Sequence, residues 1–253
     1  MNIQTFIKHC ILYLGATVRC NCKSKILFYH DVCDKTFYKS LDTDILLGTP
    51  IDVFKAHILE IKKAGYKIVP KISNQYNEVA IMFDDGFRGI WDNRQFFYDE
   101  NICPTVFLAV ELIGKPGFLV KEEILDLQDH GFIFECHSWS HRDLSCLSAE
   151  EVKKELGDSK QYLSNLLNKE VSELCLPIGY FSDTLLEELP KYGYKKVYSS
   201  IPGTADEKIM GLIESRNLCQ FASPFEVKLI LKGGSSILKN RYFKQHYKKY
   251  KRI

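Results

Sequence analysis

This chain of 253 residues lacks a long apolar run and has almost no net charge. Its most membrane-like stretch, CILYLGATV, is nine uncharged residues between Lys8 and Arg19. A helix needs about 20 apolar residues to cross a bilayer, so this stretch is far too short. It also makes a poor signal peptide, because few basic residues precede it and GATVRC is a weak cleavage site. The net charge of +2 gives no reason to expect nucleic acid as a partner.

The nine cysteines lack a repeated spacing. The disulfide framework of a small secreted domain is therefore not expected, and a reducing compartment is favoured. Cys20 and Cys22, in CNC, do not have the paired CxxC spacing of a structural zinc site. Cys136, Cys175 and Cys219 lie inside apolar runs, where we expect them to be small core residues. Internal repeats and low-complexity linkers are also missing, so nothing indicates a second domain.

Both ends of the chain are basic. Residues 1–30 contain four Lys or Arg and no acid, and residues 239–253 contain seven and no acid. We divide the chain into a basic, interfacial N-terminal segment (1–24), a central domain (25–238) and a basic tail (239–253). The tail is either a solvated, frayed end or a surface that touches anionic lipid or an acidic glycan. The termini therefore predict a cytoplasmic protein that attaches peripherally to the inner face of the membrane.

The central domain alternates short apolar runs with helical patterns. Strands are predicted at 25–30, 66–70, 79–85, 104–110, 132–137, 173–177 and 195–200, and helices at 51–65, 93–100, 121–131, 148–168 and 182–193. Ser148 precedes two acids as an N-cap, and Gly65, Gly131 and Gly193 follow the ends of three helices. The strands are continuously apolar, which is typical of a parallel sheet covered on both faces. This pattern predicts an α/β fold whose sheet is closed, or nearly closed, as a barrel.

Two predicted strand ends carry groups that suggest a metal site, and such ends meet around one crevice in parallel α/β folds. In FDDG, Asp84 and Asp85 are adjacent and therefore point to different sides, and Gly86 allows a tight turn. In HSWSH, a helical turn after the strand would project His137 and His141 from one face, where they can bind one ion. An isolated HxxxH is more often an exposed pair, but with Asp85 it forms a three-ligand set that leaves room for water.

A third strand end lies in ELCLPIGYFSD. Pro177 and Gly179 flank a tight turn, and Ser182 is the predicted cap of the next helix. Such a turn can aim backbone N–H groups into the crevice. By itself, however, a strand–Pro–x–Gly–helix junction is common.

These three segments, in this order, resemble the motifs of the polysaccharide deacetylase family, the NodB-homology or chitin-deacetylase-like carbohydrate esterases. FDDG resembles the first motif, HSWSH the second, written H-S/T-x-x-H, and LCLPIGY the less common form of the third. ILFYHDV and FKAHILEIKKAGYKIV resemble lead-in segments of members that act on exopolysaccharide. The resemblance covers most of the chain. It implies a distorted (β/α) barrel, a divalent metal and hydrolysis of N-acetyl groups on amino sugars, with 25–238 as the catalytic domain.

The resemblance also implies a role for each site residue. Asp84 would be the general base, and the backbone N–H of Ile178 would help to bind the oxyanion. Asp85, His137 and His141 would hold the metal, expected to be zinc, with iron(II), cobalt(II) and nickel(II) as alternatives. A cation beside Asp85 would make the pair of carboxylates compatible with one pocket.

Two positions depart from the family pattern. Cys175 stands where many members carry an arginine that tunes the base. Arg216, in ESRNL, is a candidate substitute, and an ordinary surface arginine is the alternative. The usual Leu-x-His source of the general acid is missing near the C-terminus, where His246 lies in the basic tail. His30, in ILFYHDV, is predicted to supply the acid, as in the exopolysaccharide subgroup, and the alternative is a local turn contact with Asp31.

The sequence therefore predicts a metal-dependent deacetylase that releases acetate from N-acetyl amino sugars of a polysaccharide or glycan precursor. Two alternatives stay open. One is a deacylase or deformylase acting on a lipid-linked amino sugar. The other is a catalytically impaired glycan-binding protein, suggested by the missing arginine and histidine. The sequence does not predict the glycan or the oligomeric state.

Overall fold

The computed structural model describes residues 3–18, 21–33 and 48–248. The strands are β1 (Lys25–Tyr29), β2 (Asp31–Cys33), β3 (Gly48–Pro50), β4 (Lys67–Ile68), β5 (Glu78–Phe83), β6 (Thr105–Leu108), β7 (Ile133–Cys136), β8 (Glu173–Cys175), β9 (Lys196–Tyr198), β10 (Lys208–Ile209), β11 (Ile213–Glu214) and β12 (Asn217–Leu218). The α-helices are α1 (Ile3–Val18), α2 (Ile51–Lys63), α3 (Gly89–Asp92), α4 (Arg94–Asp99), α5 (Lys121–Asp129), α6 (Ala149–Val152), α7 (Ser159–Leu167), α8 (Asp183–Glu188), α9 (Pro224–Leu231) and α10 (Lys239–His246). Single turns of 3₁₀-helix are η1 (Val110–Leu112), η2 (Leu144–Cys146), η4 (Pro177–Gly179), η5 (Leu189–Tyr192) and η6 (Gly234–Leu238), and η3 (Lys153–Asp158) is a π-helical segment.

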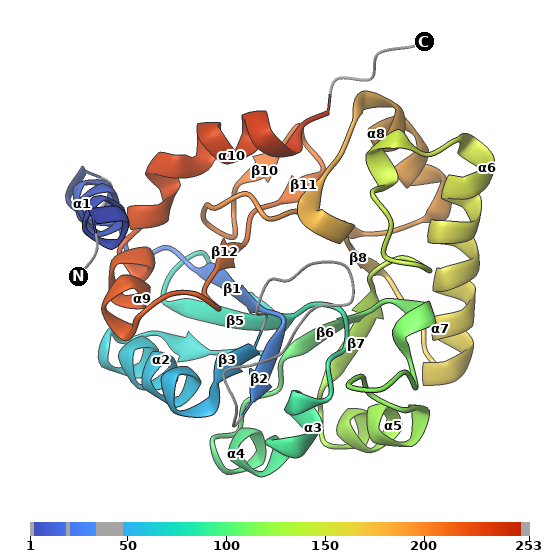
Figure 1. The fold of residues 1–253 in the computed structure, drawn as a ribbon, viewed down its shortest axis with the longest axis horizontal. Helices are drawn as coiled ribbons and strands as arrows, with labels where there is room; N and C mark the ends of the chain where they lie inside the picture. Colours follow the sequence, from blue (N-terminus) through green and yellow to red (C-terminus); the bar gives the residue numbers. More distant parts are fainter. Residues whose placement is uncertain (1–2, 19–20, 34–47, 249–253) are drawn as a thin grey trace.

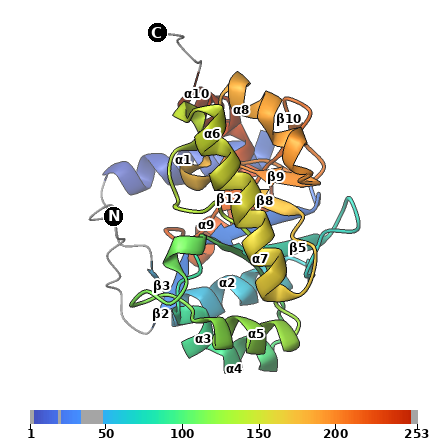
Figure 2. The ribbon, with the colours of Figure 1, turned by 90° about the vertical axis from the view of Figure 1, so that its right-hand side faces the viewer.

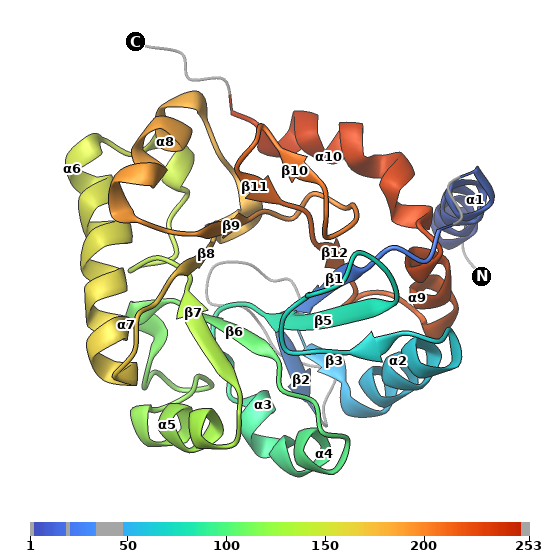
Figure 3. The same ribbon diagram turned by 180° about the vertical axis from the view of Figure 1, so that it is seen from behind.

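The ten-stranded sheet curls into a distorted (β/α) barrel, as the sequence predicted (Figures 1 and 3). The strand order is β10-β11-β9-β8-β7-β6-β5-β1-β12, and β4 also pairs with β5. All pairings in this sheet are parallel except β10 with β11. β11 and β12 lie near opposite ends of this order, yet only Ser215 and Arg216 separate them in the chain. This short connection brings the two ends of the strand order near each other.

The central barrel strands, such as β1, β5 and β6, are buried on both faces. In β1, Leu27 and Tyr29 pack outward in the main hydrophobic core, whereas Ile26 and Phe28 pack inward in a smaller cluster. Helices cover the outer face around much of the barrel (Figure 1). Alternate side chains of one strand thus enter two apolar environments, which explains the continuous apolar runs. The expectation of buried cysteines is confirmed, because Cys136, Cys175 and Cys219 are all 0% exposed.

The predicted helix over 148–168 is one long run on the outside of the barrel, made of α6, η3 and α7 (Figure 2). Ser148 forms a capping box with Glu151 at its start, so the predicted N-cap is confirmed. The predicted C-terminal glycines are confirmed as well, since Gly65, Gly131 and Gly193 have φ of 81°, 91° and 65°. The π-helical segment in the middle was not predicted.

The N-terminal helix packs against elements from the C-terminal part of the chain. α1 packs on α9 and η6, where Gly15 meets Gly234, and α10 follows η6. No helix within the described ranges is long and apolar enough to cross a membrane. Part of the sequence predictions lies outside the described residues, namely Arg19, Cys20 and residues 249–253 of the basic tail. The proposed boundaries after residues 24 and 238 remain predictions.

Candidate metal and catalytic site

The sequence motifs meet at one end of the barrel because each follows the carboxyl end of a parallel strand. Asp84 and Asp85 follow β5, His137 follows β7, and His30 follows β1. Asp85 has φ of 70° and Gly86 has φ of 81°, so the chain turns sharply after the carboxylate pair. The turn separates the two carboxylates, and each has different partners.

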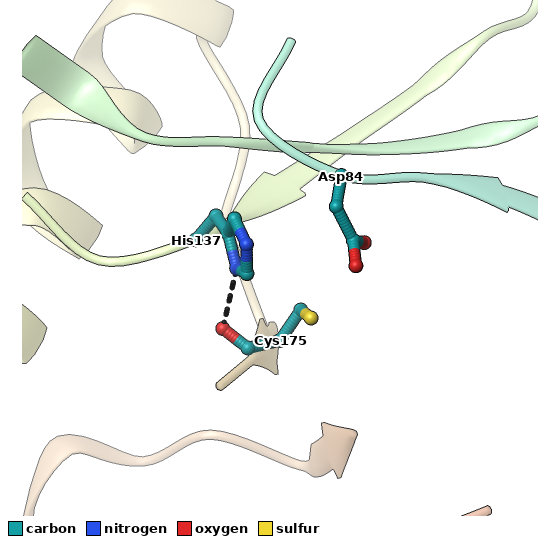
Figure 4. A group of neighbouring side chains, drawn as sticks. All are labelled: Asp84, His137 and Cys175. Carbon is teal, nitrogen blue, oxygen red and sulfur yellow. Dashed lines mark hydrogen bonds between the residues drawn. The ribbon is translucent and has the colours of Figure 1, made fainter. Parts of the chain in front are cut away.

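Asp85, His137 and His141 form a compact cluster that can hold a metal ion. Oδ1 of Asp85 lies 3.2 Å from Nε2 of His137 and 3.1 Å from Nε2 of His141. It is buried and makes no hydrogen bond within the described part of the chain. Nδ1 of His137 donates to the carbonyl of Cys175 at 2.8 Å (Figure 4). In the neutral form of the ring, Nε2 then carries a lone pair, and this lone pair faces the Asp85 carboxylate. Lone pairs that converge in this way favour a cation between them.

The predicted helical turn between the two histidines is wrong. Residues 137–141 form an irregular loop, in which Ser138 has φ of 68° and His141 has φ of 58°. Two left-handed residues curl the chain back, so the imidazoles approach with ring centroids 4.9 Å apart. The predicted pairing of His137 with His141 is therefore found, but for a different geometric reason.

Asp84 is held by Arg216. The guanidinium donates to both carboxylate oxygens, at 2.7 and 2.8 Å, and both side chains are almost fully buried. Arg216 also contacts Sγ of Cys175 at 2.9 Å, and it stacks on Phe28. Sequence analysis gave Arg216 as a candidate substitute for the arginine expected at position 175. In the structure, the guanidinium of Arg216 contacts both Asp84 and Cys175.

These contacts set the charge on Asp84. Burial alone would raise its pKa, but the charge of Arg216 and the two hydrogen bonds outweigh burial and hold the pKa below its ordinary value. Burial raises the pKa of Cys175 well above that of a free thiol. Asp84, His137 and Cys175 also face one space (Figure 4). Because Asp84 is engaged by Arg216 and Cys175 stays protonated, this second group suits a metal less well than the Asp85 cluster.

His30 lies beside the carboxylate pair. Its charge is among the causes that lower the pKa of Asp84 and of Asp85. Nδ1 of His30 hydrogen-bonds Oε1 of Gln220. The alternative, a local contact with Asp31, is not found, because Oδ1 of Asp31 instead accepts from the backbone N–H of Val32.

The turn after β8 has an unusual backbone. Ile178 has φ of 60° and ψ of −6°, and its side chain is 50% exposed. A β-branched residue rarely adopts this conformation, and such strain is concentrated at functional sites. The hydroxyl of Ser199 donates to the carbonyl of Gly179 at 2.7 Å and supports the turn. His246 packs near Gly179 behind this turn.

Sequence analysis missed two buried polar residues at this site. Gln220 follows β12 and contacts His30 across 190 positions of the chain. Glu155 lies in η3 and accepts hydrogen bonds from the loop between the two metal-site histidines. Glu155 sits among several charged residues in EEVKKEL, so nothing in its local pattern marks it as buried.

Comparisons with known proteins point to one family. A model of the polysaccharide deacetylase family matches residues 71–197. A Bacillus subtilis protein named as a polysaccharide deacetylase, YxkH, is 26% identical over 182 residues, which are 66% of this chain and 64% of that protein. The B. subtilis peptidoglycan-N-acetylmuramic acid deacetylase PdaA is 30% identical over 126 residues, 49% of this chain and 46% of that protein. The chain therefore spans less than two thirds of the length of these relatives.

Solved structures share the fold. The Streptococcus pyogenes deacetylase PplD, in complex with acetate, superposes with a TM-score of 0.71 at 21% identity, over 83% of this chain and 98% of that one. IcaB from Ammonifex degensii superposes with a TM-score of 0.71 at 15% identity, over 84% of this chain and 98% of that one. At these identities the likeness concerns the barrel and its topology.

Proposed function

Because this chain belongs to the polysaccharide deacetylase family, we propose that it hydrolyses N-acetyl groups on amino sugars of a polysaccharide or glycan precursor. The reaction releases acetate and leaves a free amine. One observation carries the proposal, namely that Asp85, His137 and His141 cluster at the same barrel mouth as Asp84 and His30. A carboxylate, a histidine and an open metal site together are the groups that amide hydrolysis requires.

Asp85, His137 and His141 are the proposed ligands of a divalent ion, which we expect to be zinc. Three protein ligands leave the fourth position of a tetrahedral zinc site for water or substrate. Iron(II), cobalt(II) and nickel(II) accept the same ligands. When bound, the ion supplies Lewis-acid polarisation of the acyl carbonyl and lowers the pKa of water.

The side chains around this cluster have the properties that the remaining steps need. Asp84, kept ionised by Arg216, takes the proton of the attacking water as general base. The backbone N–H of Ile178, in the strained turn, is proposed to donate to the developing oxyanion. His30, oriented through Nδ1 by Gln220, has Nε2 available to protonate the departing amine. The Arg216 contact argues against the impaired alternative, because the missing arginine is replaced in space.

The test is a set of single variants measured for metal content and for acyl release. N-acetylated amino-sugar oligomers and lipid-linked N-acyl amino sugars are supplied, and acetate and formate are quantified. We expect His137→Ala and His141→Ala to lose the metal, and His30→Ala to retain it while kcat falls by about 10²-fold or more. His130→Ala, at an exposed histidine on the C-cap of α5, is the matched control and should match wild type.

Unchanged metal content in both His137→Ala and His141→Ala would remove the proposed site. Release of formate without acetate would favour the deformylase alternative. A wild type that binds the metal and oligomers but releases neither acid would support a glycan-binding protein.

Cytoplasmic location and peripheral membrane attachment form a second part of the proposal. The eight cysteines in the described ranges are all free thiols, which suits a reducing compartment. On the face of α1 that points away from the barrel, Ile7, Tyr13, Leu14 and Val18 are 50–71% exposed. Such an uncharged, outward apolar face is suited to the interface of a lipid bilayer.

The charges around this face favour anionic lipid. Residues 217–253 contain a single acid, Glu226, which is buried and paired with Lys8 of α1 at 2.9 Å. Lys228 and Lys232 are exposed on and just after α9, which packs on α1. Each basic residue near an anionic surface contributes about 1 kcal/mol of binding free energy.

Vesicle sedimentation checks this attachment. We expect wild type to bind phosphatidylglycerol-containing vesicles, to bind phosphatidylcholine vesicles weakly, and to release as salt rises. Leu14→Glu should weaken binding about tenfold or more, whereas Leu59→Glu, at a position of α2 that is similarly exposed, should not. Equal effects of the two variants, or no binding to either vesicle, would count against the proposal.

A further inference from the structure

We propose that Glu155 is a positioning residue that holds the loop between His137 and His141 in its metal-binding conformation. Its carboxylate accepts from the backbone N–H of Trp139 and of Ser140, each at 2.9 Å, and from the hydroxyl of Ser140 at 2.5 Å. The inference rests on the proposed metal site, because it explains how the two histidines converge there.

The loop needs such support because its backbone is unfavourable. Ser138 and the ligand His141 both adopt positive φ without being glycine. Conformations of this kind persist only when surrounding contacts over-determine them. Within the loop, the hydroxyl of Ser138 accepts from the N–H of His141 at 3.1 Å. Glu155 engages the two residues between these strained positions, so the loop is fixed along its whole length.

Glu155 is poorly explained as a stabilising surface charge. It is 3% exposed, and no Lys, Arg or His forms an ion pair with it among the described residues. Burial of a carboxylate is costly unless hydrogen bonds satisfy it, and among the described residues its donors are Trp139 and Ser140, both in the loop between His137 and His141. Alanine is the variant that tests this role, because it removes all three contacts. A glutamine could keep both backbone contacts, which reach a single oxygen, and could donate its NH₂ group to the Ser140 hydroxyl.

The helix that carries Glu155 is itself irregular at this point. Glu155 lies in the π-helical segment η3, between α6 and α7, on the outside of the barrel (Figure 2). π-Helical turns are rare and are frequent at functional sites, since they redirect side chains that a regular helix would place elsewhere. The hydroxyl of Ser159 donates to the carbonyl of Glu155 and supports the widened turn. The irregular turn and the strained loop thus meet at one carboxylate.

The experiment is a competition titration of Zn²⁺ against a chromophoric chelator, with thermal unfolding of the metal-free and Zn²⁺-saturated protein. We expect Glu155→Ala to weaken Zn²⁺ affinity by about 10- to 100-fold, the range for loss of a contact that orients a ligand. The rise in melting temperature on adding Zn²⁺ should shrink accordingly. Glu150→Ala, at an exposed glutamate in the same helical run, is the matched control and should bind as wild type does.

Affinity of Glu155→Ala within about twofold of wild type would overturn the inference, even if the metal-free protein melted earlier, because that result would indicate a purely structural role. If Glu155→Ala does not fold, Ser140→Ala removes only the hydroxyl contact and should still weaken Zn²⁺ binding by a few fold. Unchanged affinity in Ser140→Ala would then overturn the inference. A wild type that binds no Zn²⁺ would overturn both the proposed metal site and the role of Glu155. If wild type binds Zn²⁺ and the variants bind equally well, the role of Glu155 alone is overturned.

Discussion

Asp84 and Asp85 are adjacent and chemically identical, but their side chains have different neighbours and therefore suit different roles. Asp84 is paired to a guanidinium and is held ionised, whereas Asp85 presents a buried oxygen without a hydrogen-bond donor to two imidazoles. The first arrangement suits proton transfer, and the second suits a cation. Position 175 contributes by its small size, since Cys175 leaves the space that the Arg216 guanidinium occupies.

Asp31 allows a residue-scale prediction about pH. Burial raises its pKa to about 8, although N–H groups of Val32 and Gly89 lower it and nearby Asp92 adds repulsion. The folded protein therefore keeps a proton there that the unfolded chain loses near pH 4, so stability falls as pH rises between about 4 and 8. The slope is at most about 1.4 kcal/mol per pH unit.

Urea unfolding of wild type and Asp31→Asn at pH 5 and pH 8 measures this effect. Asparagine does not ionise, so the stability of Asp31→Asn relative to wild type should improve by about 1 kcal/mol or more between the two pH values. Taking the difference between the proteins cancels the titration of all other groups. If the two proteins differ by the same free energy of unfolding at both pH values, Asp31 has the same protonation in the folded and the unfolded state, and the prediction is wrong.

At the scale of elements, the sequence was informative wherever a pattern is long. Seven barrel strands, β1 and β4–β9, were predicted, mostly because buried parallel strands are continuously apolar. β2, β3 and β10–β12 were missed, because they have only two or three residues and no longer apolar run surrounds them. The π-helical turn η3 was also missed, because local residue preferences do not distinguish it from α-helix.

The same reasoning explains which site residues could be predicted. The strand ends and the family resemblance were enough to locate four site residues. Two of the family motifs, FDDG and HSWSH, contain them and follow β5 and β7, namely Asp84, Asp85, His137 and His141. The helical turn predicted after β7 was wrong because the left-handed conformation of Ser138 carries no glycine to signal it. Contacts such as Gln220 with His30 depend on how strands β1 and β12 pair, and this is decided by tertiary packing.

At the scale of the whole molecule, the N-terminal helix α1 packs against α9 and η6 from the C-terminal part of the chain. Leu12 and Ala16 of α1 are buried, and Lys8 pairs with Glu226 of α9. Gly15 of α1 and Gly234 of η6 lie so close that a Cβ on residue 15 would stand 2.2 Å from a backbone oxygen. Small residues at a helix crossing permit this approach, so the crossing should be sensitive to any added side chain.

Gly15→Val tests whether this crossing contributes to the stability of the whole protein. Valine has a higher helix propensity than glycine, so a loss of stability must come from the clash with η6. We expect the free energy of unfolding to fall by about 1–3 kcal/mol, and the melting temperature by roughly 2–10 °C. Thr17→Val, at an exposed position of the same helix, is the matched control and should change neither quantity by more than about 0.5 kcal/mol or 2 °C. Metal content should be normal in both variants, because the Asp85 cluster is built from β5 and β7 and not from α1. If Gly15→Val and Thr17→Val melt together with wild type, α1 does not depend on this contact, and residues 1–24 behave as the separate segment that the sequence predicted.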